Sequence, residues 1–237
     1  SRDVPYTVPV DQTTTFSMVT PWDGPFTMAL SEYDMGTASM PTLQSFASAV
    51  YGPNKEWVLL AGRTNGLHGF NGSGIDNFPP KYQNTDVWVV DPITQQTWSR
   101  SLDEAGLTEA EIDSLSATNT LSHQDGDTLF VVGGYVYDRG ANDFTTYNAL
   151  SAIHLPSLVN WVKTPGVALD ANAILQVAGA EATDQSYEGG FFAVTGGSMQ
   201  ELDGRYFLVF GQNFEGPYTL GTNGAYTSQV RGFDISY

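Results

Sequence analysis

The stretch NTDVWVVDPITQQTW, residues 84–98, follows the strand-like run WVLLAG at residues 57–62, and together they form the clearest copy of a recurring pattern. The other copies are TLFVVGG (128–134) with LSAIHLPSLVNW (150–161), and YFLVFG (206–211) with QVRGFDISY (229–237). Self-similarity of this kind is the mark of repeat architectures, in which one structural unit is used several times. The sequence therefore predicts three related units.

Each unit is predicted to consist of short antiparallel strands, which makes the chain all-β. Val, Phe, Tyr, Trp and Thr are concentrated in runs of a few residues that Gly, Asn, Asp and Pro interrupt. Aligning the copies predicts strand a at 45–50, 116–121 and 190–195, strand b at 57–61, 128–132 and 206–210, strand c at 86–90, 149–155 and 229–235, and strand d at 96–100 and 159–163. The third copy ends before its strand d.

Local signals support this plan. Asp125-Gly126 and Asp203-Gly204 each precede a strand b, and Asp-Gly is typical of tight hairpin turns. A single helix is expected, over residues 108–115, between the first and second copies. Its capping box pairs Thr108 with Glu111.

The repeated pattern resembles the kelch motif of β-propellers. That motif has two glycines that end strand b, then an aromatic residue in strand c and a tryptophan in strand d. Gly133-Gly134 and Trp161 match it in the second copy, and Trp88 and Trp98 match it in the first. The resemblance implies four-stranded blades at 45–100, 116–163 and 190–237, and tryptophans that pack between blades. Residues 1–44 fit the repeat poorly, although FSMVT (16–20) and FTMAL (26–30) read as strands, and the resemblance assigns this segment either to another blade or to closure of the ring.

Three blades are fewer than the five to seven that kelch rings usually hold. Three explanations follow: the chain is part of a longer one, copies of the chain assemble, or residues 1–44 contain another unit. We expect a fragment or one part of an assembly. An open arc of blades would expose large apolar faces.

The composition narrows the function classes. The chain has 9 Lys and Arg against 26 Asp and Glu, a net charge of −17. Nucleic-acid binders need a basic face, so nucleic acid is excluded as a partner. The sequence has no cysteine, and no apolar run approaches the roughly 20 residues of a membrane span. Low Lys with abundant Asn, Thr, Gly and Tyr favours an exported bacterial protein, extracellular or periplasmic.

The long loops between strands b and c are the candidate binding surface. In a propeller these loops emerge on one face, and loops on a rigid scaffold commonly carry function. Aromatic rings beside amides and carboxylates suit a protein surface or a glycan ring. The candidate residues are Arg63, His68, Phe70, Tyr82, Tyr135, Tyr137, Arg139, Phe144, Phe214, Tyr218 and Tyr226. The alternative is that these aromatics merely pack beneath their own loops.

No catalytic set emerges from the sequence. The three histidines match no zinc spacing, and no nucleophile elbow or phosphate loop is present. No resident cofactor is expected. A calcium site that uses Asp125, Asp127 or loop carboxylates is the weaker alternative, because no segment follows the EF-hand spacing and turn formation explains Asp125 and Asp127. The leading hypothesis is a non-enzymatic propeller module for protein–protein interaction or assembly, with a protein or further blades as its partner. The alternative is a glycan-binding or glycan-processing propeller.

Overall fold

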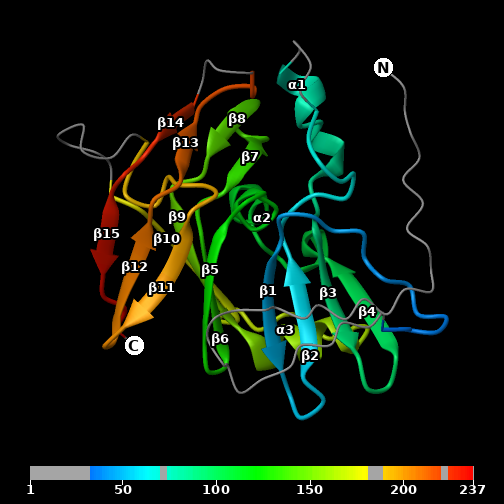
Figure 1. Ribbon diagram of the computed structural model, residues 1–237. Helices are drawn as coiled ribbons and strands as arrows, with labels where there is room; N and C mark the ends of the chain where they lie inside the picture. Colours follow the sequence, from blue (N-terminus) through cyan, green and yellow to red (C-terminus); the bar gives the residue numbers. More distant parts are fainter. Residues whose placement is uncertain (1–32, 70–73, 181–188, 220–223, 237) are drawn as a thin grey trace, which may run out of the picture. The chain divides into compact units, whose positions relative to one another are not determined.

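The computed structural model describes residues 33–69, 74–180, 189–219 and 224–236. The chain divides into two units, Ser1–Gly36 and Thr37–Tyr237, and every sheet and helix described belongs to the larger unit. The strand-like runs at 16–20 and 26–30 lie outside the described residues. Antiparallel sheets dominate the larger unit, so its all-β character is confirmed (Figure 1). No helix among the described residues is long and apolar enough to cross a membrane.

The first sheet follows the predicted plan closely. It consists of β1 (Ala47–Tyr51), β2 (Glu56–Leu60), β3 (Asp86–Asp91) and β4 (Gln96–Ser101), hydrogen-bonded in that order and antiparallel throughout. Side chains alternate across the sheet, as the period of a strand requires. Ala49 and Val58 are buried on one face, whereas Val50 and Trp57 are exposed on the other.

The second sheet contains two departures from prediction. Its strands are β5 (Leu121–Asp125), β6 (Thr128–Val132), β9 (Ala149–His154) and β10 (Ile174–Ala178), with β5 and β10 at the edges. Strand a was predicted at 116–121 and instead begins at Leu121, because residues 117–120 form the connection from the first sheet. Strand d was predicted at 159–163, but that segment is helical.

The helix α3 (Leu155–Lys163) replaces the predicted fourth strand and displaces it to β10. Pro156 stands in the first turn, where its fixed φ and missing N–H are compatible with a helix. Leu155, Leu158, Val159 and Val162 recur at helical spacing and are all buried. Trp161 is completely buried and lies beneath the guanidinium of Arg100, 4.6 Å from the ring centroid. Its predicted packing role holds, on a different element.

The third sheet has three strands among the described residues: β11 (Ser198–Leu202), β12 (Arg205–Val209) and β15 (Val230–Phe233). Strand a was predicted at 190–195, but that segment carries only an isolated bridge at Thr195. The Asp203-Gly204 turn joins β11 to β12 as expected, with φ of 53° and 81° at these residues. Such positive φ values define the tight hairpin turn that Asp-Gly favours.

The remaining elements connect the sheets. The predicted helix is α2 (Glu109–Leu115), and the capping box between Thr108 and Glu111 is present. Two further hairpins, β7 (Tyr135–Asp138) with β8 (Asp143–Thr146) and β13 (Gln212–Phe214) with β14 (Gly224–Tyr226), lie in the second and third b–c loops. The short helices are α1 (Gly74–Asn77), Pro80–Tyr82 and Leu102–Glu104.

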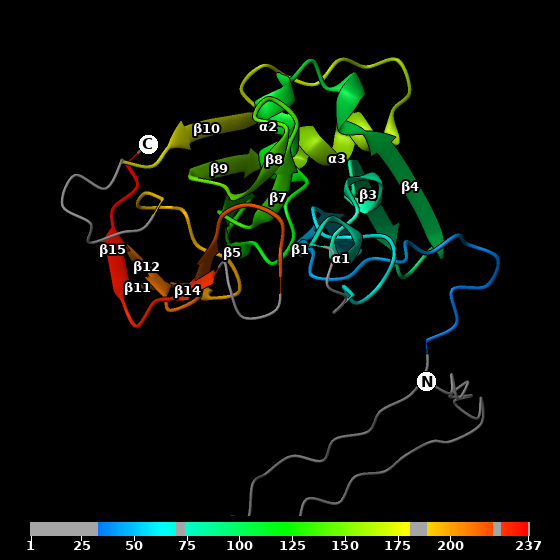
Figure 2. The same cartoon turned by 90° about the horizontal axis from the view of Figure 1, so that it is seen from above.

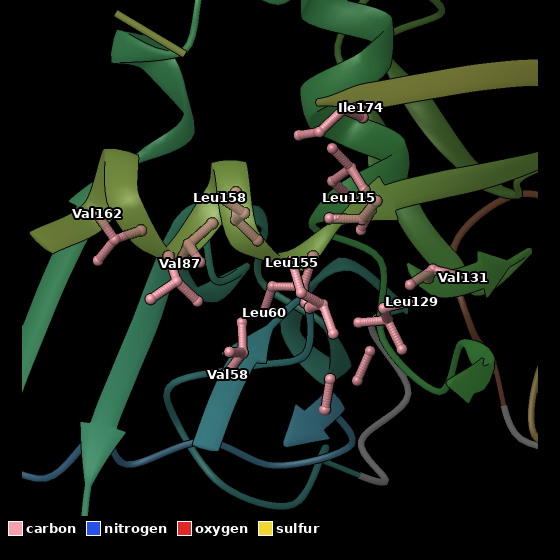
Figure 3. Close-up of a cluster of buried hydrophobic side chains, with 14 of the residues drawn as sticks. Val58, Leu60, Val87, Leu115, Leu129, Val131, Leu155, Leu158, Val162 and Ile174 are labelled. Atoms are coloured by element: carbon pink, nitrogen blue, oxygen red, sulfur yellow. The ribbon is translucent and has the colours of Figure 1, made fainter. Parts of the chain in front are cut away.

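The three sheets stand side by side, with β5 next to both β1 and β11 (Figure 2). One core cluster fills the space between the first and second sheets and includes Val58, Leu60, Leu129 and α3 (Figure 3). A second cluster joins the second and third sheets through residues such as Phe130 and Leu208. The middle sheet is therefore covered on both faces, which explains the continuous apolar run of β6.

One backbone feature occurs in all three copies. Each strand b ends in two consecutive residues with positive φ: Ala61 and Gly62 (62° and 82°), Gly133 and Gly134 (60° and 91°), and Phe210 and Gly211 (58° and 107°). The last residue of each pair is glycine, for which such φ values carry little strain. The sequence repeat thus corresponds to a repeated local structure.

Candidate functional site

The described parts of the three b–c loops converge, and α1, the β7–β8 hairpin and the β13–β14 hairpin are neighbours (Figure 1). The described residues of these loops are 63–69 and 74–85 in the first, 135–148 in the second, and 212–219 and 224–228 in the third. Aromatic rings from all three meet there. Phe78 of the first loop, Tyr135 and Phe144 of the second, and Phe214 and Tyr218 of the third belong to one cluster.

Ring contacts tie the cluster together. His68 stacks on Phe78 with centroids 4.6 Å apart and contacts the edge of Tyr218 at 5.0 Å. Tyr135 stands against Phe78 at 5.1 Å and against Phe214 at 5.7 Å. Edge-to-face and stacked pairs at these distances are favourable beyond the area that they bury. Residues far apart in the chain therefore form one packed unit.

Hydrogen bonds fix the loops to one another as well. The hydroxyl of Tyr135 donates to the carbonyl of Gly216 at 2.8 Å, and the amide of Asn77 donates to the carbonyl of Tyr218 at 3.1 Å. The hydroxyl of Thr146 and the backbone of Phe214 exchange two hydrogen bonds. Burial raises the pKa of Tyr135 strongly, so this phenol stays protonated and remains a donor.

A cavity of about 340 Å³ opens among these loops. This volume falls within the usual range for small-ligand sites. Its lining residues are His68, Phe78, Asn119, Tyr135, Thr195, Gln212, Phe214, Tyr218, Thr219, Gly224 and Tyr226. The lining combines aromatic rings with amides and hydroxyls, and it contains no Asp, Glu, Lys or Arg side chain among the described residues.

Two side-chain amides in the lining are available to a ligand. The amides of Asn119 and Gln212 make no hydrogen bond to any residue in the described part of the chain, although their backbones are well anchored. Gln212 exchanges two backbone hydrogen bonds of 2.8 Å with Thr195, so its position is fixed. An amide carries both donor and acceptor groups, which suits recognition of a peptide group or a hydroxyl.

The structure separates the sequence-predicted site residues into two groups. His68, Tyr135, Phe214, Tyr218 and Tyr226 line the cavity, and Tyr226 is 83% exposed at its rim. The remaining candidates do not line the cavity: Phe144 and Tyr137 pack behind Tyr135, Tyr82 lies beside Lys81, Arg139 binds α2, Arg63 is buried, and Phe70 is outside the described residues.

The two arginines serve structural contacts. The Nε of Arg139 donates to Asp113 Oδ1 at 2.6 Å, which ties the β7–β8 hairpin to α2. Arg63 is 4% exposed, its guanidinium lies 4.5 Å from the centre of the Phe78 ring, and it donates to Asn65 at 2.7 Å. Desolvation lowers the pKa of Arg63. Arg63 therefore supports the cavity wall from behind.

Six lining positions were absent from the candidate residues: Phe78, Asn119, Thr195, Gln212, Thr219 and Gly224. Phe78 lies in the first b–c loop and Gln212, Thr219 and Gly224 lie in the third, whereas Asn119 and Thr195 precede the first strands of the second and third sheets. These two residues occupy adjacent positions of the repeat, since Thr195 corresponds to Thr118 and Asn119 to Gly196, and the available signal for both was their place just ahead of β11 and β5. Among the described residues no group of three or more His, Asp or Glu side chains is placed to hold a metal ion.

Comparisons with known proteins found a likeness in three-dimensional structure but assigned the chain to no family. No family model matches the chain, and no curated protein matches it in sequence. Among solved structures, one titled "Structure of YjhT" resembles it with a TM-score of 0.51 at 12% sequence identity. The match covers 87% of this chain and 56% of the YjhT chain, so this chain spans little more than half the length of that relative.

Proposed function

We propose that this chain is a non-enzymatic module of kelch-like β-propeller blades that binds a partner protein through the face formed by its three b–c loops. The observation that carries the proposal is the convergence of the three loops on one preformed cavity, whose aromatic walls stand beside amides that no described residue engages. A rigid aromatic site of this kind can receive a side chain or a short loop of a partner at low entropic cost.

The charge distribution supports binding over catalysis. A glycosidase-type reaction needs two carboxyl groups on either side of the substrate. No Asp or Glu belongs to the described lining of the cavity. An uncharged lining also favours an uncharged insert, because a charged group would be desolvated without an opposite charge to compensate.

Selection from a displayed random-peptide library tests the proposal. We expect enrichment of peptides with an uncharged or aromatic residue, and we expect Gln212→Ala to weaken their binding by about tenfold, or ~1.4 kcal/mol. The matched control is Gln96→Ala, which removes an exposed amide from β4, outside the cavity lining. Failure to enrich any peptide, or equal affinities for wild type and Gln212→Ala, would contradict the assignment.

The second candidate is a glycan-binding propeller, and the composition of the lining favours it. Aromatic faces stack on sugar rings, while amides and hydroxyls can pair with sugar hydroxyls. The lining offers both, with Phe214 and Tyr226 beside Asn119 and Gln212. An array of neutral glycans distinguishes the two candidates: hits that Gln212→Ala abolishes and Gln96→Ala retains support glycan binding, and an array without hits removes it.

A further inference from the structure

Both junctions between neighbouring repeats use the same pair of backbone hydrogen bonds. The N–H of Gly62 donates to the carbonyl of Ala117 at 2.9 Å, and the N–H of Gly134 donates to that of Val194 at 2.9 Å. In each case the donor follows the end of a strand b, and the acceptor lies just before the first strand of the next sheet. This bond joins each repeat to its successor.

The second bond of the pair runs in the opposite direction. The N–H of Asn119 donates to the carbonyl of Ser45 at 3.1 Å, and the N–H of Gly196 donates to the carbonyl of Asn119 at 2.9 Å. All three residues have positive φ, of 54°, 54° and 68° for Ser45, Asn119 and Gly196. Each junction therefore has one donor and one acceptor on each side.

The third repeat has the same geometry, but these groups are unused. Neither the N–H of Gly211 nor the carbonyl of Gly196 has a hydrogen-bond partner in the described ranges. The first repeat is the mirror case. Leu43 precedes Ser45 by two residues, and this spacing is the same as between Ala117 and Asn119 and between Val194 and Gly196. Neither the Leu43 carbonyl nor the Ser45 N–H has a hydrogen-bond partner among the residues described.

Apolar side chains surround the unused groups of the third repeat. Val209 and Val230 are paired across β12 and β15, and Val230 is 57% exposed. Phe210 beside them is 56% exposed. The alternate residues Tyr206 and Leu208 are buried against the second sheet. β12 is thus apolar on both faces, which is typical of a sheet that is covered on both sides.

The first repeat also presents an apolar outer face. Val50 and Trp57 are paired across β1 and β2 and are 44% and 37% exposed. Phe46, next to Ser45, is 41% exposed. Both ends of the array of repeats therefore combine exposed apolar side chains with one backbone donor and one backbone acceptor of the junction that no described residue engages.

We propose that the outer face of the third repeat is a docking surface for the first repeat of a second copy of this chain. In this interface Gly211 N–H donates to the Leu43 carbonyl of the other copy, and Ser45 N–H of that copy donates to the Gly196 carbonyl. The occupant is identified by continuity, because the chain's own first repeat carries the half of the junction that its third repeat lacks. The inference does not depend on what the cavity binds.

The contact is heterologous, because each copy uses two different faces. A pair of copies can form it twice, which brings six sheets into one assembly. Each copy carries a net charge of −17, so electrostatic repulsion opposes association and salt should reduce that repulsion. We therefore expect the pair to form more tightly as salt is raised, in contrast to an assembly that ion pairs hold together.

Sedimentation velocity over a range of protein concentrations tests the proposal. Wild type should form a dimer, and Phe210→Glu on the third repeat and Val50→Glu on the first should each weaken it by about tenfold or more. The control is Ile93→Glu, which places the same charge in the exposed β3–β4 turn. If Phe210→Glu fails to fold by circular dichroism, Val230→Glu replaces it.

Mixing the two variants provides the decisive arm. A Glu buried without a partner should break the contact that it enters, so either variant alone has no intact contact, whereas a mixed pair keeps one of its two. An equimolar mixture of Phe210→Glu and Val50→Glu should therefore recover a dimer at concentrations where neither variant forms one alone. A wild type that stays monomeric at all concentrations and salt levels would overturn the proposal. That result is expected if a polypeptide segment other than a second copy covers the outer face of the third repeat. A mixture that stays monomeric would indicate a symmetric contact and would overturn it as well. Tyr226→Ala should leave association unchanged, which separates this surface from the cavity.

Discussion

Replacing Gly133 with alanine should destabilise the fold far more than the same change at Gly126, although the two backbones are alike. Gly133 has a φ of 60° and Gly126 a φ of 54°, so alanine meets similar left-handed strain at both sites. That strain costs about 1 to 2 kcal/mol. The surroundings differ, because a Cβ at Gly126 would meet nothing within 4 Å.

At Gly133 a Cβ would lie 2.0 Å from the carbonyl oxygen of Val194 and 2.8 Å from that of Phe192. Both are backbone atoms, so the segment that leads into the third sheet must move, and the hydrogen bond from Gly134 to Val194 must lengthen. Overpacking adds ~1 to 3 kcal/mol and the weakened hydrogen bond ~1 kcal/mol. The total for Gly133→Ala is therefore about 4 kcal/mol.

Urea unfolding followed by tryptophan fluorescence measures both variants, with the free energy of unfolding taken from linear extrapolation. We expect Gly133→Ala to lose at least ~2 kcal/mol more than Gly126→Ala, because only the first crosses a junction between repeats. Free energies of unfolding within ~0.5 kcal/mol of each other would refute the reasoning, since they would mean that the close approach of the two repeats does not exist.

Three further changes test other parts of the structure. Asp91 is buried, accepts hydrogen bonds from Ile93 and Thr94 and has a pKa held at about 2, so Asp91→Ala should cost ~1 to 2 kcal/mol near neutral pH. Because the pKa of Asp91 in the folded protein lies below the ordinary value of 3.8, its contribution to stability is complete above pH ~4 and is lost as pH falls towards 2. An Asp91→Ala variant that loses as much stability at pH 2 as at pH 7 would contradict this. Asp113→Ala should lower the free energy of unfolding in urea by ~1 to 3 kcal/mol, because it removes the buried partner of the ion pair with Arg139. The exposed carboxylate of Glu109 contacts the same arginine, and Glu109→Ala should cost under ~0.5 kcal/mol. Equal losses for the two variants would refute this reasoning. Trp161→Ala should lower the thermal midpoint most, with a loss of ~3 to 5 kcal/mol, and an unchanged midpoint would show that α3 does not pack on the first sheet.

The first sheet could be predicted almost completely from the sequence, because its strands are short, its turns carry Asp, Gly and Pro, and nothing long intervenes between β3 and β4. The helix α3 could not be predicted by aligning repeats, since VNW at 159–161 reads as a strand in that alignment. The helical spacing of Leu155, Leu158 and Val162 after Pro156 was the stronger signal. Aligning the repeats assigns the strands of one copy to the others, whereas a segment such as α3 that differs between copies can be recognised only from its own local periodicity.

The candidate site was predicted in its location more than in its residues. The expectation that the three b–c loops are neighbours agrees with the structure, because strand b ends and strand c begins at the same edge of each sheet. Which aromatic faces the cavity depends on tertiary packing. Phe144 and Tyr135 both come from the second loop, and only Tyr135 reaches the lining. Asn119 lay outside any loop considered, since its role arises from the junction between repeats.

The central claim is that loops far apart in sequence form one cavity, and cross-linking of paired cysteines tests it most directly. The chain has no cysteine, so His68→Cys with Tyr218→Cys introduces the only two thiols. The rings at these positions are 5.0 Å apart. We predict that a short thiol-bridging reagent links them within one molecule, whereas His68→Cys paired with Ile93→Cys in the β3–β4 turn is not linked. Equal reaction of both pairs, or no link between positions 68 and 218, would contradict the account.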